Sequence, residues 1–269
     1  MEKYGINYLS ILPVRTQATS KSELCTQLLF GEAYTVLKQS QDQKWLYIRN
    51  AFEQYEGWID AGQFQAVSPH FFEKIQHTNP YLSTELLTWI VLDTHTFPIV
   101  IGSHLPLYEP NQQIAYLGEK QIKISQHTIQ TPGTELGYMQ LRDFAFLYLH
   151  SPYLWGGKTP FGIDCSGFTQ QIYKLVGIPL PRDAYQQAEK GSIVPSLATA
   201  QAGDLAFFER EGKIIHVGLL LEEQQIMHAL DRVRIDPLDD HGIFNLEKKE
   251  YTHELSIIKR FFRLKLVVP

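Results

Sequence analysis

One cysteine stands between a glycine-rich approach and a segment with helical periodicity. Cys165 lies in Gly-Ile-Asp-Cys-Ser-Gly-Phe, residues 162–168, and the apolar residues after it recur at helical spacing. A thiol in the first turn of a helix feels the positive end of the helix dipole, which favours the thiolate. Two histidines follow inside apolar runs, His216 within 214–221 and His228 within 226–230. A cysteine followed at long range by histidines predicts an activated thiol nucleophile.

These side chains suit the successive steps of acyl transfer. Cys165 would attack a peptide carbonyl and form a thioester. His216 would accept the thiol proton and later protonate the leaving amine, while His228 fixes the tautomer and orientation of the His216 ring. The developing oxyanion needs preorganised donors, for which the backbone N–H of Cys165 and the hydroxyl of Tyr153 are the candidates.

Other interpretations of the same residues remain open at this point. A zinc site is one of them, because Cys165, His216, His228 and Asp164 all carry ligand atoms, although the chain has no close pair of the Cys-x-x-Cys or His-x-x-x-His kind. Asp164 is also suited to cap the helix that begins at Cys165, and Asp183 to cap a short helix after it. We favour the thiol nucleophile and predict neither a metal nor a cofactor.

The first half of the chain has the pattern of short β-strands. Turn-forming clusters separate brief alternating or aromatic-rich runs, which is typical of small closed barrels. We predict one small barrel in residues 1–70 and a second, similar one in 71–131. The expected strands are 35–38, 44–49, 56–60, 89–92, 98–101, 105–108, 114–117 and 121–125.

The second half changes to helices followed by strands. Apolar spacing predicts helices at 136–149, 168–176 and 183–190, the last two ended by Gly177 and Gly191. Strands are expected at 203–208, 213–221, 225–230 and 257–268. Helices first and antiparallel strands afterwards predict an α+β domain over 132–269. Its nucleophile would lie where the helices meet the sheet.

Charge and composition exclude several classes of partner. The formal net charge is −5 and no basic block stands out, which argues against nucleic-acid binding. No apolar run approaches the ~18 residues of a membrane helix, and the N-terminal residues lack the apolar core of a signal peptide. We therefore expect a cytoplasmic protein without a membrane partner. Cys25 is expected to fill space in a strand, not to form a disulfide with Cys165. The oligomeric state is not predicted.

Six elements occur in the order found in NlpC-type cell-wall peptidases, which are papain-like enzymes. They are Tyr153-Leu-Trp-Gly-Gly157, Asp164-Cys-Ser-Gly-Phe168, Leu180-Pro-Arg-Asp183, Ala202-Gly-Asp-Leu-Ala-Phe-Phe208, Ile215-His-Val-Gly218 and Met227-His-Ala229. The chain resembles in particular a subgroup with bacterial SH3-like domains ahead of the catalytic domain. The resemblance implies a papain-like domain for 132–269 and SH3-like domains for 1–70 and 71–131.

The resemblance also implies substrate-binding positions. The residues that match the family's cleft are Asp164, Ser166, Trp155, Arg182 and Asp183. In the subgroup, an acid at the Asp183 position pairs with the free amino group of the substrate, and a glutamate and a tyrosine of the first SH3-like domain lie near the same amine. Glu32 and Tyr55 are our candidates for those two. Ala184 departs from the small hydroxyl residue that the family often has there, so one substrate contact is lost or is made by the backbone.

The resemblance implies a thiol peptidase of murein peptide recycling. Such an enzyme would hydrolyse the γ-D-Glu–diamino acid bond of murein tripeptides or tetrapeptides with free N-terminal L-Ala, and would release L-Ala-γ-D-Glu. Two alternatives remain. One is a protein that binds cell-wall peptides and has an inactive third domain; the other is an amidase or acyltransferase on the same fold. The preferred diamino acid is not predicted.

Overall fold

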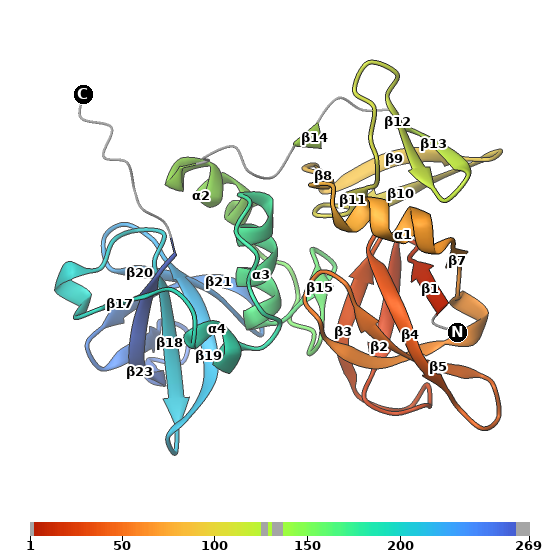
Figure 1. The fold of residues 1–269 in the computed structure, drawn as a ribbon. Helices are drawn as coiled ribbons and strands as arrows, with labels where there is room; N and C mark the ends of the chain where they lie inside the picture. Colours follow the sequence, from red (N-terminus) through yellow and green to blue (C-terminus); the bar gives the residue numbers. More distant parts are fainter. Residues whose placement is uncertain (1–2, 125–128, 131–136, 262–269) are drawn as a thin grey trace. The chain divides into compact units, whose positions relative to one another are not determined.

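The chain groups into two compact units in a computed structural model that describes residues 3–124, 129–130 and 137–261 (Figure 1). Unit 1 comprises Met1–Thr134 and Trp155–Pro160, and unit 2 comprises Glu135–Leu154 and Phe161–Pro269. The segment 155–160 thus packs with unit 1, although the predicted third domain included it. The limits 1–70, 71–131 and 132–269 stay predictions.

Unit 1 begins with a seven-stranded antiparallel sheet in the order β3-β2-β6-β5-β4-β1-β7. The strands are β1 (Lys3–Ile6), β2 (Ile11–Arg15), β3 (Leu24–Leu29), β4 (Ala33–Gln39), β5 (Trp45–Asn50), β6 (Glu56–Asp60) and β7 (Ala66–Val67), with a 3-10 turn η1 (Ala61–Gln63). Burial alternates along β2, β5 and β6, and the inward side chains, among them Leu12, Ile48 and Ile59, form one apolar core. The three strands predicted here are confirmed; β1, β2 and β7 were not predicted.

The rest of unit 1 shares a core with this first sheet. Helix α1 (Pro69–Gln76) begins after Ser68, whose hydroxyl oxygen accepts the N–H of Phe71 at 3.1 Å. Two further sheets follow: β10 (His95–Val100), β9 (Leu87–Leu92), β13 (Lys120–Ile124) and β12 (Ile114–Leu117); then β11 (His104–Leu105), β8 (Tyr81–Ser83) and β14 (Ile129–Gln130). Strand β15 (Lys158–Thr159) also belongs to unit 1. Ile6 and Phe30 pack with Ile90 and Ile99 in one cluster. A second SH3-like barrel stays a prediction.

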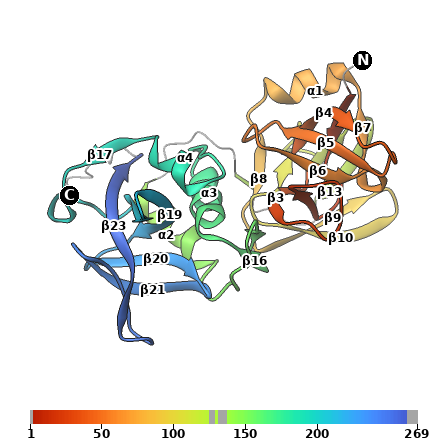
Figure 2. The same cartoon turned by 90° about the horizontal axis from the view of Figure 1, so that it is seen from below.

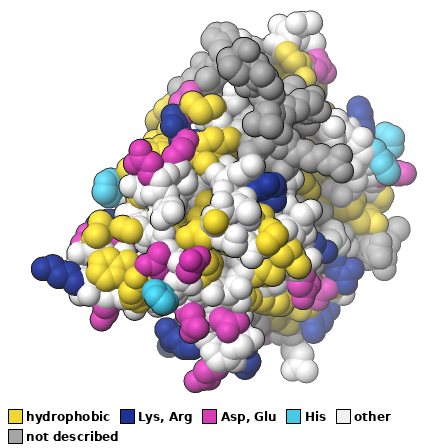
Figure 3. Space-filling model, turned by 90° about the vertical axis from the view of Figure 1, so that its left-hand side faces the viewer, with side chains coloured by type: hydrophobic (Ala, Val, Ile, Leu, Met, Phe, Trp, Pro, Cys, Tyr) yellow, Lys and Arg dark blue, Asp and Glu magenta, His cyan; other side chains and the backbone are white. Residues whose placement is uncertain are grey.

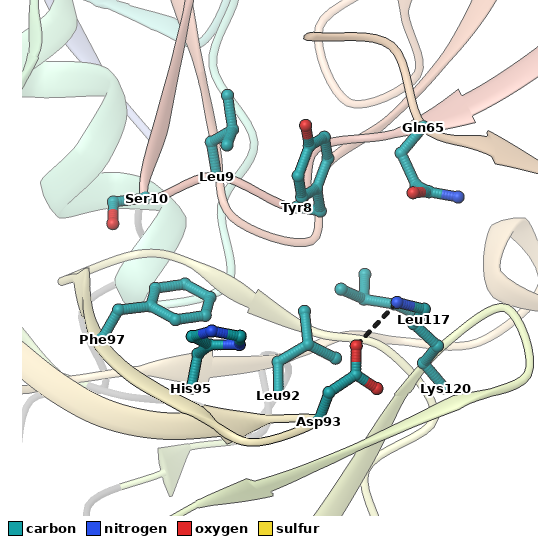
Figure 4. A pocket seen from close by; sticks show the side chains of 10 residues that line it. All are labelled: Tyr8, Leu9, Ser10, Gln65, Leu92, Asp93, His95, Phe97, Leu117 and Lys120. Carbon is teal, nitrogen blue, oxygen red and sulfur yellow. Dashed lines mark hydrogen bonds and ion pairs between the residues drawn. The ribbon is translucent and has the colours of Figure 1, made fainter.

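A pocket of about 360 Å³ lies within unit 1 (Figure 4). Tyr8 and Gln65 line one side of it, and Phe97 and His95 line the other. An exposed ion pair joins Asp93 and Lys120 at its rim, with 2.8 Å between Oδ2 and Nζ. None of the residues predicted for the functional site is among those that line this pocket.

Unit 2 places helices against a seven-stranded sheet (Figure 2). Its elements are α2 (Tyr138–Phe146), β16 (Gly162–Ile163), α3 (Cys165–Leu175), α4 (Ala184–Ala188), β17 (Ser192–Val194), η2 (Leu197–Thr199), β18 (Leu205–Arg210), β19 (Lys213–Leu220), β20 (Gln225–Leu230), β21 (Arg232–Asp239), β22 (Gly242–Asn245) and β23 (Glu250–Arg260). The strand order is β17-β23-β18-β19-β20-β21-β22, and β23 also pairs with β22, so the strands from β18 to β23 close on themselves. Helix α3 packs against β19 and β20.

The predicted helices of unit 2 are confirmed, and so are most of its predicted strands. Strands β16, β17, β21 and β22 were not predicted: β16, β17 and β22 have only two to four residues, and Pro237 interrupts the polar–apolar alternation of β21. Strand β23 begins at Glu250 instead of 257, and the predicted part of it beyond residue 261 lies outside the described residues.

The surface carries both signs of charge. Figure 3 shows lysine and arginine side chains as separate spots among acidic and hydrophobic ones on the face that it presents. No helix in the described part of the chain is long and apolar enough to cross a membrane.

Candidate active site

The thiol of Cys165 lies at the start of α3. Asp164 is the N-cap residue of this helix, and its Oδ1 accepts the N–H of Gly167 at 2.7 Å. The backbone N–H groups of Val217 and Ser166 donate to the Cys165 sulfur, which puts the thiol beside strand β19. The residue is 7% exposed. The helix start and the strand together fix the position of this thiol.

The resting thiol is protonated at neutral pH. Burial raises the pKa of Cys165 to about 12, and the negative charge of Asp164 adds to this effect. The N–H donors and Arg182 oppose it but are outweighed. The helix start therefore does not produce the expected resting thiolate, because burial is the larger effect. The thiolate has to form by transfer of the proton to a base during the reaction.

Two histidines on neighbouring strands form a direct hydrogen bond. His216 on β19 places Nε2 at 2.8 Å from Nδ1 of His228 on β20, and both side chains are buried. Gly218 pairs with His228 across the strands. A Cβ at Gly218 would come within 2.9 Å of the His228 Cβ, so the glycine of the His-Val-Gly motif leaves the room that His228 occupies.

Both histidines are neutral at pH 7. Burial holds the pKa of His216 well below its usual range, and the nearby His253 and His228 act in the same direction. Burial also lowers the pKa of His228, although Asp236 opposes this. Because Nε2 of His216 is engaged with His228, Nδ1 is the ring nitrogen left to receive the thiol proton.

The distance between the two histidine nitrogens argues against a zinc ion bound between them. The two facing nitrogens are 2.8 Å apart. Tetrahedral zinc with bonds near 2.05 Å would hold two ligand nitrogens about 3.3 Å apart, with the metal between them. Within the described residues, no three His, Cys, Asp or Glu side chains are grouped as metal ligands. The observed separation fits a hydrogen bond and supports the triad.

Tyr153 provides a neutral hydroxyl close to the thiol. Its backbone N–H donates to the carbonyl of Asp231 at 3.0 Å, which fixes the residue beside the turn between β20 and β21. Burial raises the pKa of the Tyr153 hydroxyl, and the nearby Cys165 and Asp164 raise it further. A protonated phenol at this place can donate a hydrogen bond, as the predicted oxyanion role requires.

Three of the predicted substrate-binding residues, Asp164, Ser166 and Arg182, are joined by hydrogen bonds next to Cys165. Arg182 is 1% exposed, and its two terminal nitrogens donate to the Asp164 carboxylate at 3.0 and 2.6 Å. One of them also donates to Ser166 Oγ at 3.0 Å. Asp164 thus caps helix α3, one of the roles that the sequence suggested for it. Contact of these residues with substrate stays a prediction.

Asp183 stands at the entrance to helix α4. It is half-buried at the N-cap position, and its backbone N–H donates to Gln186 Oε1 at 3.2 Å. Ala184, which follows it, is buried and opens the helix. The capping position predicted for Asp183 is present, and its role toward a substrate amine stays a prediction.

The remaining predicted site residues, Glu32, Tyr55 and Trp155, belong to unit 1. Glu32 is fully buried; its Oε2 accepts the N–H of Leu29 at 3.0 Å and lies 3.8 Å from Lys158 Nζ. Tyr55 is half-buried. Trp155 is 59% exposed, and its indole N–H donates to the carboxylate of Glu23, an exposed residue that was not predicted.

Two residues of the histidine cluster were also not predicted. Asp236 on β21 lies 3.0 Å from Nε2 of His228, and the ring of His253 on β23 stacks on that of His216 at 4.1 Å between centroids and 25° between planes. Arg232, Arg234 and Asp236 alternate with apolar residues, which is a strand signal that marks Asp236. Nothing in the sequence around His253 distinguishes it.

We expect the buried ring of His253 to make the protein less stable in acid. Burial lowers the pKa of His253 to about 4 from 6.5, so between these two pH values the unfolded chain binds a proton at His253 and the folded chain does not. His253→Phe keeps the ring and removes the titration. Between pH 7.5 and 4.5, wild type should lose about 2 kcal/mol more of its free energy of unfolding than the variant, measured by urea denaturation. An equal loss of free energy of unfolding in wild type and in His253→Phe would mean that the titration of His253 does not destabilise the fold in acid.

Comparisons with known proteins identify the domains of this chain. Residues 150–251 match the NlpC/P60 family, and residues 14–64 match the bacterial dipeptidyl-peptidase Sh3 domain. The gamma-D-glutamyl-L-lysine dipeptidyl-peptidase of Bacillus subtilis is 31% identical over 254 residues, covering 88% of this chain and 81% of that protein. The protein of the same name from Bacillus cereus is 30% identical over 255 residues, covering 83% and 73%.

A solved structure shares the fold. The crystal structure of an NlpC/P60 family protein from Bacillus cereus superposes with a TM-score of 0.80 at 22% sequence identity, covering 96% of this chain and 99% of that one. The family match spans the nucleophile and both histidines, and the Sh3 match lies in the first sheet of unit 1. With its thiol at a helix start, its histidine pair and its relatives of similar length, the chain belongs to the NlpC/P60 family and is a cysteine peptidase with a bacterial SH3 domain.

Proposed function

We propose that this peptidase hydrolyses the γ-D-Glu–diamino acid bond of murein peptides whose N-terminal L-Ala is unblocked, releasing L-Ala-γ-D-Glu. The observation that carries the proposal is the hydrogen-bonded pair His216–His228 together with Val217, the residue after His216, whose N–H donates to the Cys165 sulfur. The relatives named gamma-D-glutamyl-L-lysine dipeptidyl-peptidase support the choice of bond.

The chemistry follows from the protonation states of the site. As the Cys165 sulfur attacks the γ-carbonyl carbon of D-Glu, the thiol proton passes to Nδ1 of His216. The backbone N–H of Cys165 and the Tyr153 hydroxyl stabilise the oxyanion. The His216 imidazolium then gives its proton to the leaving amine of the diamino acid, which leaves a thioester. Water, deprotonated by His216, attacks the thioester; the C–S bond breaks, the γ-carboxyl group is freed, and the His216 imidazolium returns its proton to the Cys165 sulfur.

Recognition of the free amine requires an accessible carboxylate. Asp183 is half-buried at a helix start and meets this requirement in unit 2. In unit 1, Glu32 is wholly buried and next to Lys158, whereas Glu23 is exposed and accepts the indole N–H of Trp155. Trp155 follows Tyr153 by two residues in the chain. Glu23 is therefore the accessible acid of the two, and the amine-binding role that the resemblance suggested for Glu32 and Tyr55 stays a proposal.

A neutral variant of Asp183 tests the amine gate. Asp183→Asn removes one charge-assisted hydrogen bond to the amine, so it should raise KM for the free-amine peptide by about 10- to 100-fold with kcat nearly unchanged. Glu32→Gln and Glu23→Gln test the acids of unit 1: a raised KM in one of them would support its role at the amine. Steady-state kinetics on L-Ala-γ-D-Glu-diaminopimelate supplies both constants. An unchanged KM in Asp183→Asn would contradict the role of this residue at the amine.

The experiment for the function itself is a mass-spectrometric digest. L-Ala-γ-D-Glu-diaminopimelate, its lysine counterpart and the N-acetylated form of each are incubated with the full chain. Cleavage of only the free-amine peptides to L-Ala-γ-D-Glu supports the proposal. Equal cleavage of the acetylated forms would keep the peptidase and remove the amine gate. Products of a different mass would indicate an amidase or acyltransferase, and no cleavage would favour a peptide-binding protein.

A requirement for free L-Ala implies a place in peptide recycling. In intact murein this alanine is acylated by muramic acid, so only peptides already released from the glycan would be substrates. Whole sacculi should therefore be digested far more slowly than free tripeptide. The cytoplasmic location stays a prediction, which cell fractionation with an antibody against the chain tests.

A further inference from the structure

A buried carboxylate lies directly behind the histidine pair of unit 2. Asp236 is 1% exposed, and its Oδ2 lies 3.0 Å from Nε2 of His228. Arg234 donates two hydrogen bonds to the same carboxylate, from Nε to Oδ2 at 2.7 Å and from Nη2 to Oδ1 at 3.0 Å. The strand register explains the arrangement: Arg234 pairs with His228 across β20 and β21, and Asp236 is two residues further on the same face.

The charge of Asp236 fixes which nitrogen of His228 carries a proton. Burial alone would raise the pKa of Asp236, but the hydrogen bonds from His228 and Arg234 outweigh it and lower that pKa, so the group is ionised at pH 7. A carboxylate can only accept hydrogen bonds. The proton of the neutral His228 ring therefore resides on Nε2, and its Nδ1 carries a lone pair.

The proton position on His228 in turn fixes the proton position on His216. Nδ1 of His228 can only accept, so Nε2 of His216, 2.8 Å away, has to donate. A neutral His216 with its proton on Nε2 has an unprotonated Nδ1, the form that can accept the thiol proton. We propose that Asp236, held by Arg234, is a positioning residue of the catalytic system: it fixes the tautomers of both histidines and so makes Nδ1 of His216 the base. This inference rests on the roles proposed for Cys165 and His216.

No proton has to reach Asp236 in this scheme. When the thiol proton moves to Nδ1 of His216, the imidazolium keeps its Nε2 proton and shares it with His228, which keeps its own Nε2 proton toward Asp236. The carboxylate then offsets the positive charge two rings away. Charged or titratable neighbours of the histidine pair are Arg234 and Asp236 on β21 and His253 on β23, with Glu247 2.9 Å from Arg234. The sulfur of Cys165 accepts the N–H of Val217, the residue after His216.

The first test reads the tautomers directly. Nitrogen-15 NMR of histidine-labelled full-length protein should show both His216 and His228 protonated on Nε2 in wild type. In Asp236→Asn the amide presents an NH2 group either to Arg234 or to His228 Nε2. The single Nε2–H form of His228 should therefore give way to a mixture that includes Nδ1–H, and Asp236→Glu should restore it. A mixture in wild type, or an unchanged single form in Asp236→Asn, would overturn the proposal.

The second test reads the reactivity of the thiol without a substrate. Alkylation of Cys165 by iodoacetamide, followed by peptide mass spectrometry against Cys25 as internal reference, should slow about 100-fold in Asp236→Asn because less His216 is in the basic form. The pH dependence of the rate should change shape as well. With a cleavable peptide, kcat should fall by a similar factor at unchanged KM, and Asp236→Glu should recover part of it.

Asp204 supplies the matched control. It is also buried and paired with an arginine fork, Arg260 Nε to Oδ1 and Nη2 to Oδ2 at 2.7 Å each, but within the described residues this pair makes no hydrogen bond to a histidine. Asp204→Asn should lower stability about as much as Asp236→Asn while alkylation and tautomers stay as in wild type. Equal behaviour of the two variants would reduce Asp236 to a structural role. Because neither readout needs a substrate, failure of the proposed peptide specificity is recognised separately in the digest.

Discussion

Replacement of Cys165 by alanine is expected to abolish hydrolysis of the γ-D-Glu–diamino acid peptide, with a loss of at least about 10⁴-fold in kcat. A thioester requires a sulfur atom, and the polar residues next to Cys165 are engaged with one another, since Arg182 donates to both Asp164 and Ser166. Alanine is a good helix former and fits the first turn of α3, so the fold should persist.

Cys25 provides the control for this loss. It lies half-buried on β3 of unit 1, where its thiol donates to the carbonyl of Val14 at 3.3 Å. Cys25→Ala should keep the wild-type rate in the same mass-spectrometric digest. Persistence of cleavage in Cys165→Ala would assign the hydrolysis to another group and return the metal interpretation to consideration. Loss of cleavage with retained binding of the peptide, measured by calorimetry, would separate catalysis from recognition.

Local sequence signals were sufficient to predict the elements that carry Cys165, His216 and His228. Asp164 before Cys165 is a helix-cap signal, and the apolar runs around His216 and His228 are strand signals, so each element could be predicted from its neighbours in the chain. Contacts that depend on strand register could not. The Asp236–His228 bond requires that β20 and β21 pair with Arg234 opposite His228, and a shift of one residue would turn Asp236 to the other face.

Short or interrupted patterns also left parts of the fold unpredicted. Strand β21 alternates polar and apolar residues, but it contains Pro237 and its buried side chains include Arg234 and Asp236, so the alternation alone does not indicate which residues face inward. Strand β22 has four residues, and in helix α1 the buried residue is Phe71, so neither has a long apolar pattern.

Glu32 belongs to a buried cluster that the sequence did not predict. Its side chain is enclosed in unit 1 with Glu53 and Lys158, and Lys158 lies 105 positions from Glu53 in the chain. Lys158 Nζ is 3.2 Å from Glu53 Oε2 and 3.8 Å from Glu32 Oε2, and all three side chains have no exposed surface. No local pattern reveals that a lysine so far along the chain is the partner of two buried acids.

Lys158→Met is expected to cost about 3–5 kcal/mol of the free energy of unfolding at pH 7.5, because it leaves two buried carboxylates without their cation. Urea denaturation followed by tryptophan fluorescence measures the loss. The control is Lys120→Met: Lys120 pairs with Asp93 at 2.8 Å, but both side chains are about half exposed, so the expected loss is below about 1 kcal/mol. Equal losses in the two variants would mean that the buried charges are not compensated by Lys158.

The triple variant Lys158→Met, Glu32→Gln, Glu53→Gln distinguishes lost charge from lost packing. Removing the acids together with the cation should recover most of the stability, because the penalty arises from uncompensated charge and not from the missing ammonium itself. The kinetics of this variant then address the site. Residues 155–160 lie in the chain between Tyr153 and Cys165 and belong to unit 1, where Lys158 N–H also donates to Gln27 Oε1 at 2.8 Å. If the recovered fold cleaves peptide at the wild-type rate, this buried ion cluster serves stability alone; a lower kcat would mean that the lysine is also needed to hold the segment that leads to the nucleophile.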